Sequence, residues 1–188
     1  SVKITPLGSH EGEFCKFDRA LILEDPNGTR FLYDAGRTVA GADDNRLGNI
    51  DVILVSHLHG DHVGDKHITA VNQGSCQKPE VTVNDSPLNN SVKIAVNKQA
   101  VIITGSEMPK FFAKKLKLAG GDPSLSKLVR FGAKTTLNQI EITTVPAAHS
   151  NGISGALIGG QFGKMLDENG ITAYAGPPTG YVIKFTNG

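Results

Sequence analysis

The sequence predicts an α/β fold in which sheets pack on each other and helices lie outside them. Three observations support this class. Short apolar runs separated by turn residues fill the early part of the chain. The run 50–55 has little polar interruption, as is typical of a strand covered on both faces. A segment with helical periodicity, residues 107–119, follows that central strand.

The early part of the chain predicts three strands. Residues 2–7 alternate enough to form the first, and a loop over residues 8–19 follows it. The runs 20–23 and 31–34 flank an Asp-Pro-Asn-Gly segment at 25–28. Proline presets one backbone dihedral angle there and Asn-Gly accepts positive φ, so we expect a hairpin.

The middle of the chain predicts a break in regular structure, followed by a strand and a helix. Residues 69–97 are polar, asparagine-rich and poorly periodic, which favours an insertion or a long loop. Residues 101–104 then form a candidate buried strand. Ser106 offers an N-cap for the helix 107–119, and two glycines at 120–121 would end that helix.

The last third predicts three more strands, at residues 128–131, 139–145 and 181–185. The final one is entered through the turn-forming sequence Pro-Pro-Thr-Gly. The sequence contains no internal repeat. With 188 residues, one domain is the default, and the chain is long enough to bury a hydrophobic core.

The charge balance argues against two classes of partner. The chain has 19 basic and 18 acidic residues. Such a balance gives no broad electrostatic attraction to nucleic acid or to anionic membranes. No apolar run approaches the roughly 18–20 residues needed to span a bilayer. We therefore expect a soluble protein without a membrane partner and without a nucleic-acid partner.

The chain contains two cysteines, Cys15 and Cys76, and no CxxC motif. They are too few and too far apart for a zinc site made of cysteines. They form either one disulfide in an exported protein or two ordinary buried thiols. Because the chain begins at Ser1 rather than methionine, the absence of a targeting peptide is uninformative. We favour a periplasmic or secreted location over a cytoplasmic one.

Four potential metal ligands, His57, His59, Asp61 and His62, follow directly after the apolar run 50–55. Imidazole nitrogens and carboxylate oxygens are suitable zinc ligands. The first two side chains can project to one side of the chain while the last two diverge, so one loop can serve two neighbouring metal positions. Three crowded histidines without a metal would bring polar nitrogens that need partners. The alternative is a histidine-rich surface turn.

The segment from Ser56 to Gly64 contains His-Leu-His-Gly-Asp-His and resembles the HxHxDH signature of the metallo-β-lactamase fold superfamily. In this family a further metal-binding histidine follows a later strand, and His149 in Val-Pro-Ala-Ala-His-Ser matches that description. The Gly-Tyr strand at 180–183 also resembles a strand of the family. The resemblance covers nearly the whole chain and implies an αββα sandwich.

Carried over by position, the resemblance implies that His57, His59 and His149 bind a first metal ion. Asp61 and His62 would contribute to a second. The expected cofactor is zinc, as one or two ions, with manganese or iron as alternatives.

The family pattern also predicts ligands that this sequence does not supply. A bridging acidic residue on the next strand and a late histidine have no candidate here. We therefore expect residues 1–188 to be one domain of this type, incomplete on its C-terminal side, with the remaining segment of the domain as a partner. The strand 181–185 would otherwise be a terminal strand without its partner. The alternative is a naturally shortened relative with one metal site.

Other residues have weaker claims to a role. His10, in the first loop, is a candidate for substrate contact, although a surface position is the simpler interpretation. His67 is a candidate extra ligand. Phe14 and Phe17 form either an apolar lid over the substrate or part of the packing against the sheet.

The expected chemistry follows from the metal. Zinc lowers the pKa of bound water to about 7, so hydroxide is available at neutral pH. We predict a hydrolase that uses a zinc-bound hydroxide on a small ester, lactone or related small-molecule substrate. The second metal, or Asp61 when that site is empty, would orient the nucleophile and help with proton transfer. One alternative is a phosphodiesterase or RNA-processing nuclease of the same fold, which the balanced charge disfavours. Another is a non-catalytic metal-binding domain or a fragment of a longer enzyme.

Overall fold

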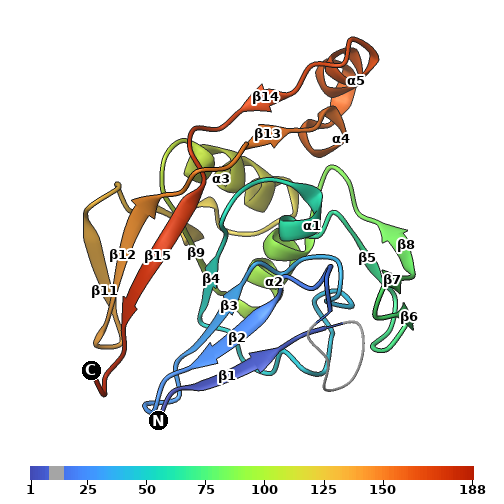
Figure 1. Cartoon of the computed structure of the whole chain (residues 1–188). Coiled ribbons are helices and arrows are strands. Elements are labelled where there is room, and N and C mark those ends of the chain that lie inside the picture. Colours follow the sequence, from blue (N-terminus) through green and yellow to red (C-terminus); the bar gives the residue numbers. More distant parts are fainter. Residues whose placement is uncertain (9–14) are drawn as a thin grey trace.

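Two sheets and a layer of helices make up the body of the protein in the computed structural model, which describes residues 1–8 and 15–188 (Figure 1). The larger sheet has six strands in the order β1-β2-β3-β4-β9-β10. The smaller sheet has three strands in the order β11-β12-β15. The bounds of these nine strands are β1 Lys3–Pro6, β2 Leu21–Glu24, β3 Arg30–Tyr33, β4 Val52–Leu54, β9 Val101–Thr104, β10 Ser126–Leu128, β11 Lys134–Leu137, β12 Ile140–Pro146 and β15 Thr179–Lys184.

The larger sheet is antiparallel at one side and parallel at the other. Strands β1, β2 and β3 form an antiparallel meander. Strands β3, β4, β9 and β10 run parallel, with Leu32 opposite Ile53 and Ile53 opposite Ile102. Because the carboxyl ends of parallel strands meet at one edge, the residues that follow β3 and β4 lie next to each other there.

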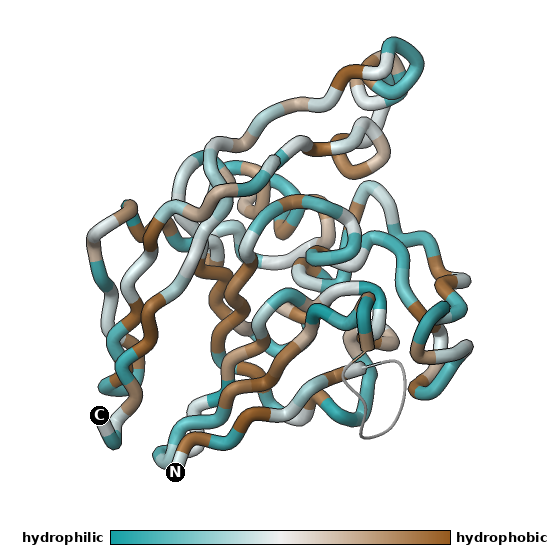
Figure 2. Tube along the Cα trace, viewed as in Figure 1, coloured by the Kyte–Doolittle hydropathy of each residue, from teal (hydrophilic) through white to brown (hydrophobic). Residues whose placement is uncertain are grey.

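Alternation along the central strand β4 divides the core into two parts. Ile53 faces helices α2 (Asn90–Lys98) and α3 (Met108–Leu118) and belongs to the larger cluster of buried side chains. Val52 and Leu54 face the other way and pack with the smaller sheet. Both faces of β4 are therefore buried, as the uninterrupted apolar run predicts. Figure 2 shows this concentration of hydrophobic residues along the central strands.

The smaller sheet covers the face of the larger sheet opposite the helices. Its inner side chains, including Ile140 and Ile142, complete the second core cluster. Its outer face is open among the described residues, with Val182 59% exposed. Strand β15 pairs with the earlier strand β12 over six residue pairs and forms an edge of this sheet among the described residues. The helix, sheet and sheet layers confirm the predicted α/β class.

Residues 69–97 contain more regular structure than the expected insertion or long loop. Strand β5 (Lys66–Ile68) pairs with β8 (Val81–Asn84), and β6 (Gly74–Ser75) pairs with β7 (Lys78–Pro79). Helix α2 begins inside the same stretch, where the Asn89 side chain accepts a hydrogen bond from the N–H of Val92. The exposed hairpin accounts for the polar composition of this stretch.

The expected helix after β9 is present as α3, but its cap differs. Glu107 rather than Ser106 is the N-cap residue, and its side chain makes no capping hydrogen bond. Ser106 instead has a φ of 59°, in the left-handed region. A short 3-10 helix, η1 (Pro123–Leu125), leads from α3 to β10. No described helix combines the length and the apolar composition needed to cross a bilayer.

An arm projects from the body between β12 and β15 (Figure 1). Its base is a pair of short strands, β13 (Gly152–Ile153) and β14 (Ala173–Tyr174). Helices α4 (Gly155–Ile158) and α5 (Gly160–Glu168) form the far end. These helices touch through glycine, because a Cβ at Gly155 would lie 1.9 Å from the carbonyl oxygen of Gly163.

Candidate metal centre

A tight turn after β4, residues 56–64, carries the histidine motif and is called the histidine loop below. It contains the short helix α1 (Gly60–Val63). Glycine is required at two points. A Cβ at Gly60 would lie 2.4 Å from Oδ1 of Asp65, and Gly64 ends α1 with a φ of 72°. The sequence His-Gly-Asp-His-Val-Gly therefore forms a compact turn at the carboxyl edge of the sheet.

Three histidines form one cluster at this edge. Donor atoms of His57, His59 and His149 all lie within 4.8 Å of one another. The first two come from the histidine loop and the third from the segment after β12. Nε2 of His57 is 3.1 Å from Nδ1 of His59. The ring centroids of His57 and His149 are 4.5 Å apart. The structure thus brings together side chains that are far apart in the sequence.

This donor set fits a zinc ion. Two nitrogens bound to one tetrahedral zinc at about 2.0–2.1 Å would be about 3.3 Å apart. The 3.1 Å between His57 and His59 is close to that separation. Three imidazoles leave a further coordination position open, which is the pattern of catalytic rather than structural zinc sites.

Hydrogen bonds to the other ring nitrogens orient two of these ligands. Nδ1 of His57 lies 2.9 Å from the hydroxyl oxygen of Ser56. Nδ1 of His149 donates to the carbonyl oxygen of Ser150 at 2.8 Å. Each of these contacts leaves Nε2 of the ring available to a metal ion, and partners of this kind typically fix the tautomer of a ligating histidine.

Asp34, the residue after β3, organises the second part of the site. Its carboxylate accepts hydrogen bonds from the backbone N–H of Ser56 at 2.8 Å and from the Ser56 hydroxyl at 2.7 Å. Nδ1 of His62 donates to the same carboxylate at 2.7 Å. Nε2 of His62 therefore faces outward, 3.5 Å from Oδ2 of Asp61. These two atoms thus lie side by side next to the three-histidine cluster.

Asp61 also has a cationic neighbour. Nε of Arg19 lies 3.5 Å from Oδ2 of Asp61, and both side chains are 31% exposed. A pair this open to solvent contributes little to stability. Its effect is to bring the Arg19 guanidinium to the rim of the site.

Burial favours the neutral form of two histidines in the cluster. Burial lowers the pKa of His57 to about 3, and the neighbouring rings of His62, His59 and His149 add to this lowering. Burial also lowers the pKa of His59. Neutral imidazoles are the form that binds metal, so at neutral pH these two ligands need lose no proton to bind an ion.

Tyr181 in β15 ties the smaller sheet to the edge that carries the site. Its hydroxyl lies 2.8 Å from the carbonyl oxygen of Val55 and 2.7 Å from that of Ile103. Burial raises the pKa of this phenol well above its ordinary value, so it remains protonated and serves as a donor. Nearby, the backbone N–H of Thr179 donates to the carbonyl oxygen of Ser56 at 2.7 Å.

The remaining sequence candidates lie elsewhere or have other partners. His67 is buried away from the cluster, and its two ring nitrogens contact the carbonyl oxygen of Ile68 and the carboxylate of Asp85. Phe17 is 39% exposed and has the Lys16 ammonium 5.5 Å from its ring centroid. His10 and Phe14 lie outside the described residues.

A cavity of about 470 Å³ opens beside the histidine loop. It is bordered by the loop, by the segment after β3 and by the base of the arm. Its lining includes Arg37, Leu58, His59, Asp61, Ser154 and Thr172. A ligand in this cavity would therefore lie against two side chains of the histidine motif.

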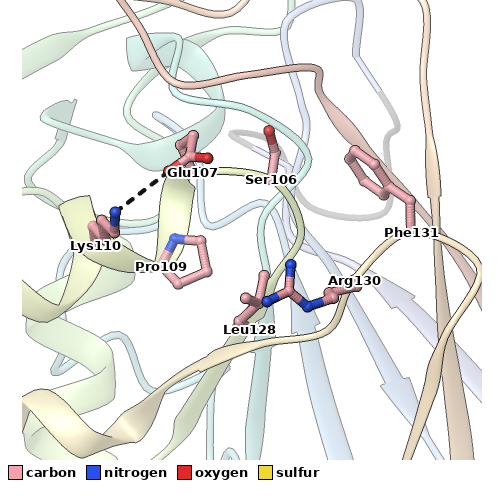
Figure 3. Close-up of a pocket in the computed structure, with 7 residues that line it drawn as sticks. All are labelled: Ser106, Glu107, Pro109, Lys110, Leu128, Arg130 and Phe131. Carbon is pink, nitrogen blue, oxygen red and sulfur yellow. Dashed lines mark ion pairs between the residues drawn. The ribbon is translucent and has the colours of Figure 1, made fainter.

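A second cavity, of about 350 Å³, lies at the start of α3 (Figure 3). Glu107 and Lys110 form an ion pair of 3.8 Å on one side, and Arg130 and Phe131 lie opposite. None of the residues that line it is a histidine. It offers no nitrogen donor set of the kind found in the histidine cluster, so we place the candidate site in the first cavity.

Comparisons with known proteins agree with this geometry. No family model matches the chain. A protein of Pyrococcus furiosus described as a UPF0173 metal-dependent hydrolase is 28% identical over 183 residues, covering 97% of this chain and 64% of that protein. A protein of Thermodesulfovibrio yellowstonii with the same description is 24% identical over 173 residues, covering 88% of this chain and 52% of that protein. The chain thus spans between half and two thirds of the length of these relatives.

A solved structure shows a related fold. Igni18, a metallo hydrolase from the archaeon Ignicoccus hospitalis, matches with a TM-score of 0.53 and 17% sequence identity. The match covers 98% of this chain and 56% of that chain. Together with the His-x-His spacing of His57 and His59, these similarities confirm the fold expected from the sequence.

Proposed function

We propose that this chain, which has a metallo-β-lactamase-type fold, is part of a metal-dependent hydrolase. The observation that carries the proposal is the cluster of donor atoms from His57, His59 and His149 within 4.8 Å. The printed descriptions of the relatives as metal-dependent hydrolases support it. A bound zinc ion would supply Lewis acidity and lower the pKa of water to about 7.

The side chains around the cluster have separate tasks. His57, His59 and His149 would hold the ion, and the Ser56 hydroxyl fixes the first ring. Asp61 lines the cavity and has an accessible carboxylate, so it is placed to hold a water molecule by a hydrogen bond and to accept a proton.

Zinc is the metal that we propose first. All three clustered ligands are imidazoles, a donor type that suits zinc, copper, iron and nickel. The open coordination position favours zinc in a catalytic role. Manganese and iron are the alternatives that metal analysis separates.

For the substrate we propose a small ester, lactone or related molecule. A cavity of about 470 Å³ is within the size range of small-molecule sites. The near-equal numbers of basic and acidic residues favour such a substrate over a long polyanion.

We further propose that a segment of the same domain outside this chain supplies the bridging acid and the late histidine. The greater length of the relatives supports this, since the chain covers 64% and 52% of two of them. The open outer face of the smaller sheet, where Val182 is 59% exposed, offers such a segment a surface.

We also propose a periplasmic or secreted location. The disulfide between Cys15 and Cys76, which have a Cα–Cα distance of 5.3 Å, supports this. Disulfides persist in oxidising compartments and are rare in the cytosol.

The hydrolase proposal is tested by metal analysis and hydrolysis assays on two variants. The purified protein is expected to contain one to two equivalents of zinc and to hydrolyse p-nitrophenyl acetate. His59→Ala is expected to lose metal and activity together, because it removes one of three clustered ligands. Lys117→Ala, on the exposed face of α3, is the control. A metal-free wild-type protein, or full activity in His59→Ala without metal, would overturn the proposal.

A further inference from the structure

We propose that Arg37 recognises an anionic group of the substrate, a carboxylate or a phosphate, in the cavity beside the histidine loop. This inference rests on the proposed hydrolase function and names the class of molecule that the enzyme would act on.

Arg37 lies on the wall of the cavity that His59 and Asp61 also line. A group held by its guanidinium would therefore occupy the same space as a molecule in contact with the histidine cluster. The lining also includes residues at the base of the arm, Ser154 and Thr172 among them. Their hydroxyl groups suit a small polar molecule.

The backbone of Arg37 is fixed to the histidine loop and its surroundings. The preceding residue, Gly36, donates its N–H to the carbonyl oxygen of His62 at 3.0 Å. A Cβ at Gly36 would lie 3.0 Å from the carbonyl oxygen of Asp61, and its φ is 65°. The carbonyl oxygen of Arg37 itself accepts a hydrogen bond from Ile68 at 2.9 Å. Backbone hydrogen bonds thus hold Arg37 in place beside the histidine loop.

The Arg37 side chain has unused hydrogen-bonding capacity. Its Nε is buried and has no hydrogen-bond partner. In the described part of the chain it forms no ion pair, whereas Arg30 and Arg46 pair with carboxylates. A guanidinium stays charged in proteins and presents its N–H groups as a planar fork that matches a carboxylate or a phosphate. The terminal N–H groups of Arg37 form no hydrogen bond or ion pair within the described residues, so an anionic ligand in the cavity would supply their partner.

The surrounding charges leave this cation uncompensated. Asp61 is the carboxylate among the residues that line the cavity, and Arg19 lies 3.5 Å from it. Two guanidinium groups thus border one carboxylate before any metal is counted. Bound metal would make the site still more positive. An anionic substrate would be attracted to this site, while a neutral one would leave Arg37 unsatisfied.

Paired substrates and a binding measurement test this inference. We would compare p-nitrophenyl acetate with mono-p-nitrophenyl succinate, which adds a carboxylate, and with bis-p-nitrophenyl phosphate. In Arg37→Ala the ratio of kcat/KM for the anionic substrates to that for the acetate is expected to fall about tenfold or more. Arg37→Lys, which keeps the charge and loses the fork, should give an intermediate ratio. Arg130→Ala, in the other cavity, is the matched control and should leave the ratio unchanged (Figure 3).

Calorimetric titration of the metal-loaded protein with succinate and with inorganic phosphate separates this inference from the hydrolase proposal. Arg37→Ala should weaken the binding of at least one anion about tenfold at equal metal content, whether or not any ester is hydrolysed. The anion whose binding weakens more in Arg37→Ala, succinate or phosphate, shows whether Arg37 prefers a carboxylate or a phosphate group. Equal anion binding by the wild type, Arg37→Ala and Arg130→Ala would overturn the inference even in an active enzyme. Inactivity towards every ester with Arg37-dependent anion binding would overturn only the hydrolase proposal.

Discussion

The side-chain oxygen of Asn151 accepts a hydrogen bond from the backbone N–H of Leu58 at 2.8 Å, across 93 residues of sequence. Leu58 lies between two histidines of the cluster, and Asn151 follows the third, His149, by two residues. The amide nitrogen of Asn151 donates to the carbonyl oxygen of Gly176 at 2.9 Å, and the residue is 1% exposed. One buried amide therefore links the two segments that supply the three clustered histidines.

Replacing this amide should loosen the metal centre. Asn151→Ala leaves the N–H of Leu58 and the carbonyl of Gly176 without their partner, which should lower the free energy of unfolding by about 1–3 kcal/mol. Zinc affinity should fall as well, because His149 is no longer tied to the histidine loop. Urea unfolding and competition with a chelator measure the two effects. Asn187→Ala, at an exposed position, is the control, and an Asn151→Ala variant with wild-type zinc affinity would contradict this role.

Asp34 should determine the geometry of His62. Asp34→Asn keeps the shape of the side chain but removes the charge that accepts hydrogen bonds from Ser56 and His62. Loss of a partner that orients a metal ligand typically costs about 10–100-fold in metal affinity or activity. We expect a loss in that range for the second metal equivalent and a smaller effect on the first. Stepwise metal titration checks this, and equal weakening of both equivalents would argue against it.

The ion pair between Asp44 and Arg46, which lies away from the site, should make the free energy of unfolding depend on pH. Burial alone would raise the pKa of Asp44, but hydrogen bonds from the Arg46 side chain and from the backbone N–H groups of Ala40 and Arg46 outweigh it and lower that pKa. A lowered pKa in the folded state means stabilisation that is present above the unfolded value of about 3.9 and is lost as pH falls through the folded value.

Asp44→Asn should therefore cost about 2 kcal/mol of unfolding free energy at pH 7, where the charge-assisted hydrogen bonds are intact. The difference between the variant and the wild type should shrink below about pH 4. Urea unfolding at several pH values measures it. A difference that is independent of pH would show that the ionised carboxylate is not its cause.

Removing the disulfide should destabilise the protein without changing its metal-binding side chains. Cys15 and Cys76 are 61 residues apart in sequence. Closing a loop of that size typically contributes about 2–4 kcal/mol. The double variant Cys15→Ser, Cys76→Ser should lose that amount in urea unfolding and retain zinc. Unchanged stability would mean that the two segments are held by other contacts.

Strands were more predictable from the sequence than helices. The apolar runs of β3, β4 and β9 fix their positions because each strand is buried on at least one face. Helix α2 was missed because the polar residues around it hide its period. The arm was missed for a different reason: Phe162, Met165 and Leu166 of α5 have helical spacing, but the glycines around them interrupt the pattern, and the two helices meet through a close backbone contact.

Most of the candidate metal ligands were predictable because they share one short motif, whereas the residues that support them were not. The close spacing of His57, His59 and His62 in the sequence identifies them as candidate ligands. Asp34 was counted as the end of a strand, and its role arises only when β3 and β4 lie side by side. Asn151 and Arg37 acquire their roles from contacts between distant segments, which no local pattern encodes.

The meeting of two loops at Gly36 and Gly64 has a consequence for how the site can vary. A Cβ at Gly64 would lie 2.2 Å from the carbonyl oxygen of Gly36, so the two backbones are in direct contact. One loop carries Arg37 and the other the histidines. A mutation that shifts either backbone must displace the other. Changes at this junction would therefore alter substrate selectivity and metal binding together. New substrate preferences would have to arise from the lining residues at the base of the arm.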